Sequence, residues 1–330
     1  MKEVSVAILG AGSMGKKHAR NLAAMEGVSV VGVSDADSHA AERFAASQEP
    51  HPRVFADFGS MYEQAKPDAV FICLPPFAHT TEVEEAAAHG IHVFMEKPIA
   101  LTSSKALLMA EAVESANVVS QVGYMLRHSG AITRIKGLLE SGAAGKPTLY
   151  RGFYNCNALH TEWWRDREKS GGQLFEQAIH IYDLGLLFLG EPASVGARMA
   201  NLCHGDVEGY TVEDTSASVI QFKSGSIATI AATNCAIPGT WHHEFTLVCE
   251  RLVATVIDGK ELHITYTDED PPRRVSHTFD DDPYLAEARS FIDSVRAGTQ
   301  TATPIRTGYQ GVRLVEAAVQ SSSSGRFIEL

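Results

Sequence analysis

The sequence lacks the features that mark several common protein classes. No apolar run reaches the length of a membrane-spanning helix. The N-terminal residues lack the basic segment followed by an apolar segment that is typical of a secretory signal peptide. No run is rich in lysine or arginine, and the net charge of −12 argues against nucleic acid or an anionic membrane surface as a partner. We therefore expect a soluble globular protein.

Cysteine is scarce and scattered. The five cysteines form no Cys-x-x-Cys pair, and several lie in apolar, strand-like runs. This pattern is typical of buried, reduced thiols in a cytoplasmic protein. No group of histidines and cysteines has the spacing of a metal site, so no metal is expected. The 330 residues, 45% of them hydrophobic, are enough for two domains or one large α/β unit.

Glycine, in contrast, is concentrated near the N-terminus. The apolar run Val4–Leu9 leads into Gly10-Ala11-Gly12-Ser13-Met14-Gly15, and a helix-favouring segment follows. A strand, a G-x-G-x-x-G turn and a helix in this order predict a dinucleotide site, in which the helix N-terminus faces the phosphates. The first glycine permits the tight turn, the second lets the backbone approach a pyrophosphate, and the third allows close helix–strand packing. The alternative is a glycine-rich turn without a ligand. The cofactor-binding residues predicted here are Gly10, Gly12, Ser13, Met14 and Gly15.

Asp35 indicates which dinucleotide binds. It stands 20 residues after Gly15, at the end of a second strand-like run. A carboxylate there can accept both ribose hydroxyls of NAD and would repel a 2′-phosphate. No arginine or lysine occurs in residues 35–39, so we expect NAD rather than NADP. The alternative is that Asp35 only caps a helix that begins at Ala36.

Helices alternate with apolar strands from this point to Val122. This order predicts a doubly wound, parallel Rossmann sheet in a dinucleotide-binding domain, residues 1–123. Consecutive strands with short connections follow, which predict a large, mostly antiparallel sheet in an α+β domain for substrate binding and oligomerisation, residues 124–330. The last helix could pack back on the first domain. The strands expected in the second domain are 148–155, 194–199, 215–222, 226–233, 244–249, 251–256 and 262–267.

Two strands of the first domain end in residues suited to a ligand site. The run 91–95 ends in Glu96-Lys97-Pro98, and the run 69–74 ends in two prolines. The carboxyl ends of parallel strands border the crevice where open α/β sheets bind ligands. The alternative for Lys97 is a side chain that reaches water without a function. The strand-end residues expected at the cofactor are Leu74, Pro75, Pro76, His79, Glu96 and Lys97.

A second stretch combines burial with ionisable groups. After Gly171-Gly172 the sequence is helical to Gly190 and apolar nearly all round, which is typical of a buried helix. Glu176, His180 and Asp183 nevertheless share one face, four and three residues apart. Such groups are costly to bury unless they line a cavity. The alternatives are a structural Glu–His–Asp network or a metal pair, the latter disfavoured by the absence of further ligands.

These motifs together resemble the Gfo/Idh/MocA oxidoreductases, the family of glucose–fructose oxidoreductase and inositol dehydrogenase. The resemblance rests on the glycine turn, on Glu96-Lys97-Pro98 and on His180-x-x-Asp183, and it extends over nearly the whole chain, including Val212-Glu213-Asp214-Thr215. It implies that Lys97 and His180 are catalytic. One departure is visible, because Glu176 stands where the family usually has aspartate. The longer side chain would place its carboxylate about one methylene deeper in the site.

The resemblance implies reversible oxidation of a secondary alcohol on a cyclic sugar or polyol. His180 would act as general base, Lys97 would stabilise the developing alkoxide, and Glu176 would orient His180 or hold a neighbouring hydroxyl. Aromatic and hydrogen-bonding side chains suit a sugar, with ordinary packing as the alternative for each. The candidate substrate contacts are Tyr124, Arg127, His160, Trp164, Arg165 and Asp183.

Two other functions stay open at this point. Some relatives use the same hydride step transiently to cleave a glycosidic bond, and the fold also hosts nucleotide-binding sensors without turnover. The presence of both Lys97 and His180 argues against a sensor. A strand-rich second domain should also leave one sheet face without helices, so we expect a homodimer or homotetramer formed through that sheet.

Overall fold

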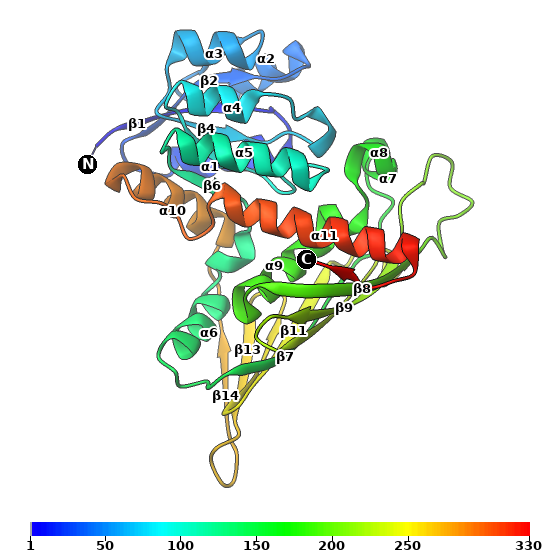
Figure 1. Cartoon of the computed structure of the whole chain (residues 1–330). Coiled ribbons are helices and arrows are strands. Elements are labelled where there is room, and N and C mark those ends of the chain that lie inside the picture. The colour runs from blue at the N-terminus through cyan, green and yellow to red at the C-terminus, as the bar shows by residue number, and fades with distance from the viewer. Residues whose placement is uncertain (1) are drawn as a thin grey trace. The chain divides into compact units, whose positions relative to one another are not determined.

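A computed structural model describes residues 2–330 as two compact units. Unit 1 comprises the chain up to Met125 together with Tyr284–Gln310, and unit 2 comprises Leu126–Pro283 together with Gly311–Leu330 (Figure 1). Among the described residues, no helix is both long enough and apolar enough to cross a membrane.

Unit 1 contains a parallel six-stranded sheet in the order β3-β2-β1-β4-β5-β6. Every neighbouring pair runs parallel, and this confirms the predicted Rossmann topology. The strands are β1 (Val4–Leu9), β2 (Val28–Ser34), β3 (Arg53–Phe55), β4 (Ala69–Ile72), β5 (His92–Met95) and β6 (Ser120–Val122).

The helices of unit 1 cover a sheet whose central strands are buried on both faces. Phe71 of β4 and Phe94 of β5 stack with ring centroids 4.4 Å apart, and Phe291 of α10 meets both rings edge-on at 5.4 and 5.8 Å. A segment near the end of the chain therefore completes the core of the nucleotide-binding unit. The helices are α1 (Ser13–Ala23), α2 (Ser38–Ala46), η1 (Pro76–Ala78), α3 (Phe58–Ala65), α4 (Glu82–Ala88), α5 (Ser103–Ser115) and α10 (Pro283–Ala297).

Unit 2 is built on a nine-stranded sheet in the order β14-β13-β12-β11-β7-β10-β9-β8-β15. Only the β7–β10 pair is parallel, which confirms a mostly antiparallel sheet. All seven strands expected from the sequence are present, and β14 and β15 are additional. The strands are β7 (Pro147–Asn155), β8 (Pro192–Ala200), β9 (Thr215–Phe222), β10 (Ile227–Thr233), β11 (His242–Cys249), β12 (Leu252–Ile257), β13 (Glu261–Tyr266), β14 (Arg273–Thr278) and β15 (Ile328–Glu329).

One face of this sheet is covered by helix α9. A Cβ at Gly152 of β7 would lie 2.5 Å from the Ile181 side chain, so the helix approaches the strand backbone closely. The hydroxyl of Tyr150 donates to the Ile181 carbonyl at 3.1 Å. The helical segments of unit 2 are η2 (Met125–His128), α6 (Gly130–Glu140), α7 (Glu162–Arg165), α8 (Arg167–Ser170), η3 (Leu174–Ala178), α9 (Ile179–Leu189) and α11 (Ile305–Ser324), the last divided between the units.

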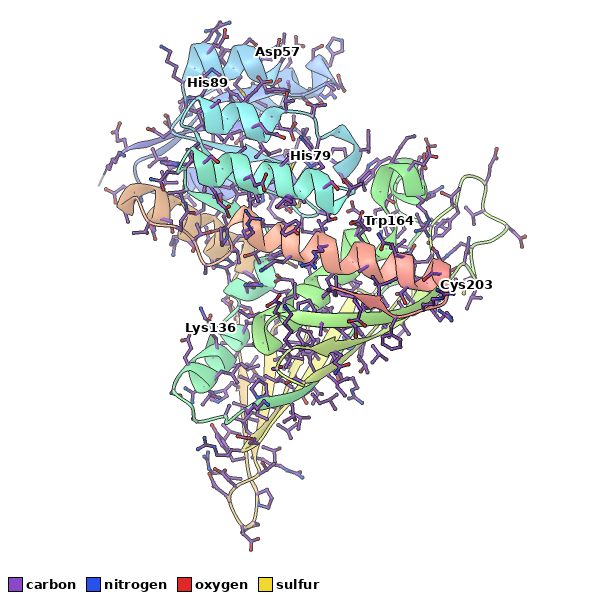
Figure 2. The ribbon with its side chains drawn as sticks, viewed as in Figure 1. Asp57, His79, His89, Lys136, Trp164 and Cys203 are labelled. Carbon is purple, nitrogen blue, oxygen red and sulfur yellow. The ribbon has the colours of Figure 1, made fainter. Side chains whose placement is uncertain are left out.

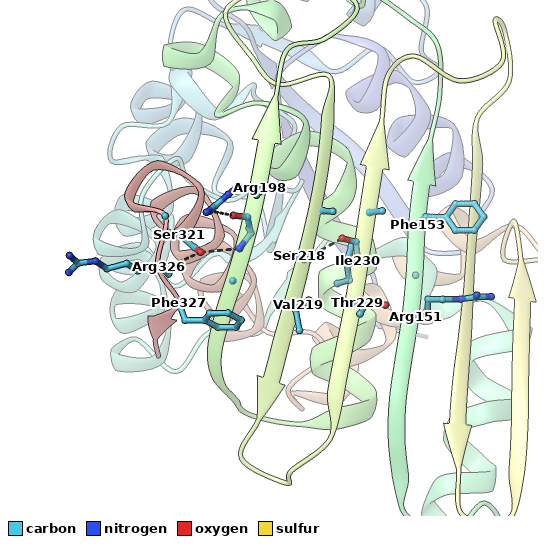
Figure 3. A pocket seen from close by; sticks show the side chains of 16 residues that line it. Arg151, Phe153, Arg198, Ser218, Val219, Thr229, Ile230, Ser321, Arg326 and Phe327 are labelled. Atoms are coloured by element: carbon cyan, nitrogen blue, oxygen red, sulfur yellow. Dashed lines mark hydrogen bonds between the residues drawn. The ribbon is translucent and has the colours of Figure 1, made fainter.

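The opposite face of the sheet carries exposed apolar side chains. Leu149, Val219 and Ile227 are 40%, 43% and 45% exposed, and they alternate with buried residues along their strands, as the period of a pleated strand requires. A hollow of about 820 Å³ lies on this face, and Figure 3 shows the side chains that line it, with Phe327 at one side. This apolar surface belongs to the part of unit 2 that α9 does not cover.

Candidate active site

The glycine turn after β1 has the geometry of a dinucleotide site. Gly10 has a φ of +100°, and a Cβ there would lie 2.5 Å from the Cys73 carbonyl oxygen. A Cβ at Gly15 would lie 2.0 Å from the Gly10 carbonyl oxygen, so both positions require glycine. A Cβ at Gly12 would meet no atom within 4 Å. Protein packing therefore does not demand glycine at position 12, and a pyrophosphate is expected in the open space beside it.

Asp35 is held at the edge of this turn. Its Oδ2 accepts the Ala11 N–H at 2.7 Å, and its Oδ1 accepts the Asp37 N–H at 2.8 Å. The following helix begins at Ser38, and its cap is Asp37, whose carboxylate accepts the His39 N–H at 3.0 Å. Asp35 is thus not the helix cap that the alternative interpretation required. Its half-buried carboxylate lies beside the glycine turn, where ribose hydroxyls are expected.

The segment after β5 that carries Lys97 is fixed by a buried side-chain contact of the preceding residue, Glu96. The Glu96 carboxylate is 7% exposed and lies 2.7 Å from Nε2 of the fully buried His18 on α1. Glu287 of α10 contributes a third ionisable group within 4.8 Å. Strand β5 ends at Met95, and half-buried Lys97 lies in the bend that follows Glu96. Contact between Glu96 and the cofactor stays a prediction.

The loop after β4 is fixed by another buried pair. Nδ1 of His79 lies 2.6 Å from a carboxylate oxygen of Glu82, and both side chains are at most 2% exposed. The Thr80 N–H donates to the same carboxylate at 2.7 Å. This pairing stabilises the loop that begins with half-buried Leu74 and Pro75 and continues through buried Pro76. Direct contacts of Leu74, Pro75, Pro76 and His79 with the cofactor stay predictions. A contact of Tyr124, which is 1% exposed, with the substrate also stays a prediction.

In unit 2 the helix that carries His180 differs from the regular helix expected from the sequence. Leu174–Ala178 forms a π-helical turn, and the α-helix α9 starts only at Ile179. The wider turn changes the angular relation of Glu176 to His180, so their spacing is not that of one regular α-helical face. π-Turns of this kind are frequent at functional sites because they redirect side chains. His180 is 6% exposed, and Glu176 is half-buried.

The start of this helix depends on Glu213, a residue that the sequence analysis did not single out as functional. Its carboxylate, 1% exposed, accepts the Leu174 N–H at 3.0 Å and a guanidinium N–H of Arg167 at 2.6 Å. A Cβ at Gly172, where φ is +100°, would lie 2.4 Å from the same carboxylate. The glycine therefore makes room for the acid that holds the helix N-terminus. The only signal in the sequence was the Val212-Glu213-Asp214-Thr215 motif.

Asp183 and Arg127 pair with each other. Two guanidinium nitrogens of Arg127 donate to the two carboxylate oxygens of Asp183, each at 2.7 Å. Burial raises the pKa of Asp183, and the guanidinium offsets part of that increase. Because Asp183 is only 1% exposed, this bidentate pair is well placed to hold α9 against η2. Contact of either side chain with substrate stays a prediction.

Three other candidate residues lie together. The rings of His160 and Trp164 are 4.1 Å apart, and two guanidinium nitrogens of Arg165 donate to the carbonyls of Leu159 and His160, each at 2.9 Å. Arg165 thus stabilises the loop that carries His160. Figure 2 marks Trp164 on the short helix α7.

Sequence reasoning missed the polar side chains around His160. Nε2 of Gln177 lies 3.2 Å from Nε2 of His160, and the thiol of Cys156 lies 3.8 Å from the same nitrogen. Asn234 accepts from the Cys156 thiol at 3.0 Å and from the Gln173 amide at 2.7 Å. These residues come from three separate segments, around residues 156–160, 173–177 and 234, so no single local motif could have grouped them.

Comparison with known proteins agrees with this geometry. Residues 4–124 match the family model of the oxidoreductase family with an NAD-binding Rossmann fold, and residues 132–254 match the Gfo/Idh/MocA C-terminal domain. The chain belongs to the Gfo/Idh/MocA oxidoreductases. It is an NAD-dependent member, as the match of its first domain states.

Individual relatives are similar over nearly the full length. The scyllo-inositol 2-dehydrogenase (NAD⁺) of Bacillus subtilis is 28% identical over 98% of this chain and 94% of its own. The 2,7-anhydro-N-acetylneuraminate hydratase of Mediterraneibacter gnavus is 27% identical over 84% of this chain and 77% of its own. A levoglucosan dehydrogenase structure in complex with NADH and levoglucosan superposes with a TM-score of 0.90 at 22% identity, covering 100% and 99% of the two chains.

The Gfo/Idh/MocA assignment makes the glycine turn testable. Gly12→Ala should keep the thermal stability of the wild type, because the added methyl meets no protein atom. It should weaken NADH binding by at least about tenfold, because the methyl would occupy the space of the pyrophosphate. Gly15→Ala is the matched variant, and its methyl collides with the Gly10 carbonyl, so it should lower the melting temperature. Fluorescence titration and calorimetry measure both effects. Unchanged NADH affinity in Gly12→Ala would contradict the proposed cofactor position.

His128, next to Arg127, predicts a pH dependence. Burial and the positive charges of Arg127 and Lys136 lower its pKa from about 6.5 to about 4. Between these values the unfolded chain binds the proton and the folded protein does not, so stability falls as the pH drops from about 6.5 towards 4. The loss between pH 7 and pH 5 should be about 2 kcal/mol.

The His128→Gln variant should lack this contribution, and His39→Gln, which alters a side chain that is 79% exposed, serves as control. Urea unfolding at pH 7 and pH 5 measures the difference for each protein. If His128→Gln and the wild type lose the same stability on acidification, the imidazole is protonated in the folded state.

Proposed function

We propose that this oxidoreductase transfers a hydride between NAD and a secondary alcohol of a cyclic sugar or polyol. The observation that carries the proposal is His180, an imidazole 6% exposed on a helix that begins with a π-turn. A nearby cluster of His160, Trp164 and Gln177 offers an aromatic face and hydrogen-bonding groups, which suit a sugar ring. The relative named as an inositol dehydrogenase supports a cyclic polyol as the substrate class.

In the proposed mechanism His180 removes the hydroxyl proton as general base. Lys97 donates a hydrogen bond to the same oxygen and stabilises its developing negative charge. The turn Gly10–Gly15 and Asp35 would hold NAD, which would supply the hydride acceptor in one direction and the donor in the other. Glu176 orients His180 or holds a neighbouring hydroxyl. The proton and hydride leave the same alcohol, which becomes a ketone.

The kinetic test compares single and double variants. His180→Ala should reduce kcat by roughly 10²–10⁴-fold by removing proton transfer, and Lys97→Ala should cost a similar order. The double variant should lose much less than the product of both effects, because the two groups serve one oxygen. NADH affinity should change little in His180→Ala. NAD⁺ reduction against a panel of inositols, sugars and glycosides provides the assay.

His263→Ala is the matched control, since this histidine is exposed on β13 and has no proposed role. If His180 only stabilised the fold, His180→Ala would lower the melting temperature and leave turnover nearly normal. A folded His180→Ala protein with wild-type turnover on its substrate would therefore end the proposal.

A redox-neutral reaction is the second candidate. The relative named as a hydratase favours it, because its name describes no net oxidation. Lys97 and His180 would then act twice, once in oxidation of the sugar and once in its re-reduction, with bond cleavage between. The same panel separates the candidates, since the dehydrogenase accumulates NADH and the redox-neutral enzyme consumes a glycoside without net NADH. A nucleotide-binding sensor would give neither product.

We also propose that the open face of the nine-stranded sheet pairs with a second copy, giving a homodimer or homotetramer. Its exposed apolar residues and its hollow of about 820 Å³ support this, because such a face needs cover. Val219, near the middle of the face in Figure 3, is a direct probe. A cytoplasmic location is part of the proposal, since all five cysteines carry free thiols.

Replacing Val219 by glutamate should dissociate the assembly, because it places like charges across a two-fold interface. Leu108→Glu is the control, since Leu108 is 56% exposed on α5 of unit 1. Light scattering at micromolar concentration gives the mass of each protein. A monomeric wild type would contradict the proposal.

A further inference from the structure

Four side chains with metal-ligating atoms gather at one end of the unit 2 sheet. Ligand atoms of Cys203, Asp214 and Cys235 all lie within 4.8 Å of one another. Nδ1 of His204 lies 3.3 Å from Oδ2 of Asp214 and 4.0 Å from Sγ of Cys235. Two thiols and a carboxylate thus surround one point, and the His204 imidazole lies beside the carboxylate and the Cys235 thiol. None of them belongs to the proposed catalytic groups.

The strand register explains why these residues meet. Ala200 at the end of β8 pairs with Thr215 at the start of β9, and Thr215 pairs with Thr233 at the end of β10. The segments that follow Ala200, precede Thr215 and follow Thr233 therefore leave the sheet next to one another. Cys203 and His204 follow β8, Asp214 precedes β9, and Cys235 follows β10. Figure 2 marks Cys203 in the loop after β8.

The backbone around the cluster is already fixed. The Asp214 carboxylate accepts N–H groups of Leu202, Cys203 and His204 at 2.9, 2.7 and 3.0 Å. The Cys235 N–H donates to Thr233 Oγ1 at 3.0 Å. Hydrogen bonds of this kind orient the ligands of metal sites. Asp214 therefore organises the loop, and its carboxylate also lies within 4.8 Å of the two thiols.

A tetrahedral ion would require the ligand atoms of Cys203, Asp214 and Cys235, which lie within 4.8 Å of one another, to move closer together. With Zn–S bonds of about 2.3 Å and Zn–N bonds of about 2.0 Å, ligand atoms on a tetrahedron lie roughly 3.3–3.8 Å apart. The His204–Asp214 distance of 3.3 Å already has this value, and the His204–Cys235 distance of 4.0 Å is a few tenths of an ångström longer. Thiolate and imidazole ligands select zinc over magnesium or calcium.

We propose that Cys203, His204, Asp214 and Cys235 form a structural Zn²⁺ site. On binding, each thiol releases its proton to solvent, and each thiolate sulfur donates an electron pair to the ion, so no oxidant is required. All four ligands come from the protein, as in structural rather than catalytic zinc sites. The sequence analysis expected no metal, because the ligands come from three separated segments that only the sheet register brings together.

The ion would stabilise the loop between β8 and β9. This loop carries Tyr210 and Val212, which pack against Trp164, and the ring of His204 lies 4.8 Å from the ring of Tyr210. A zinc ion joining this loop to the end of β10 would restrain the support of Trp164. This inference does not depend on which reaction the protein catalyses.

The test uses the full-length protein, reduced and stripped of metal with a chelator, and then titrated with Co²⁺ and Zn²⁺. Cobalt should bind at one equivalent with the thiolate charge-transfer absorption and strong d–d bands of tetrahedral coordination, and one equivalent of zinc should displace it. The Kd for zinc should lie below about 1 µM. Cys203→Ser and Cys235→Ser should weaken binding by more than about 100-fold, since even indirect partners of a metal ligand cost 10–100-fold.

Cys203→Ser is the main variant because Cys203 is exposed, so the change does not disturb the core. Cys249→Ala, which alters a thiol at the end of β11, should bind metal like the wild type. Absence of the charge-transfer band, a weaker Kd, or unchanged binding in Cys203→Ser would overturn the proposal. A disulfide would also overturn it, and would appear as two thiols that react with an alkylating reagent only after reduction.

Discussion

The buried pair between Glu96 and His18 is the contact on which the nucleotide-binding unit depends. It joins the chain just after β5, which carries Lys97, to α1, whose first residues Ser13–Gly15 form the end of the glycine turn. A buried carboxylate without a partner would be strongly destabilising, so the two elements are held in a fixed relation. The cofactor turn and the lysine thereby share one anchor. Gly123 allows this arrangement, because a Cβ there would lie 3.0 Å from the Glu96 carboxylate.

The need to pair buried charges also determines the surroundings of the helix that carries His180. Its surroundings are apolar, yet Glu213 holds its first turn through Leu174 and Arg167, and Asp183 is paired with Arg127. Each buried acid has a partner from a distant part of the chain, as the cost of burying charge requires. Both ends of the segment around His180 are therefore fixed by charge-assisted hydrogen bonds. Side chains held in this way can keep the orientation that proton transfer needs.

Local patterns predicted those features that depend on local physics. The glycine turn could be placed because strand, turn and helix are contiguous, and most strands could be placed because apolar runs of that length have few alternatives. Edge strand β14 was missed because Arg273–Thr278 is polar and mostly exposed. The contribution of Phe291 to the first core was invisible, since nothing in the sequence ties residue 291 to residues 71 and 94. The π-turn, Glu213 and the cysteine cluster likewise depend on packing between distant segments.

At Glu176 a departure from the family sequence pattern coincides with a departure from regular helix geometry. The family pattern has aspartate at this position and glycine two residues later, whereas this chain has Glu176 and Ala178. Both residues lie in the π-turn Leu174–Ala178. A longer acid and a wider turn thus coincide, and together they shift a carboxylate relative to its position on a regular helix. Because a carboxylate recognises hydroxyls by distance and direction, the hydroxyl pattern of the substrate should differ here from that of relatives with aspartate. We therefore expect this turn, more than His180, to distinguish the substrate of this chain from those of relatives with aspartate.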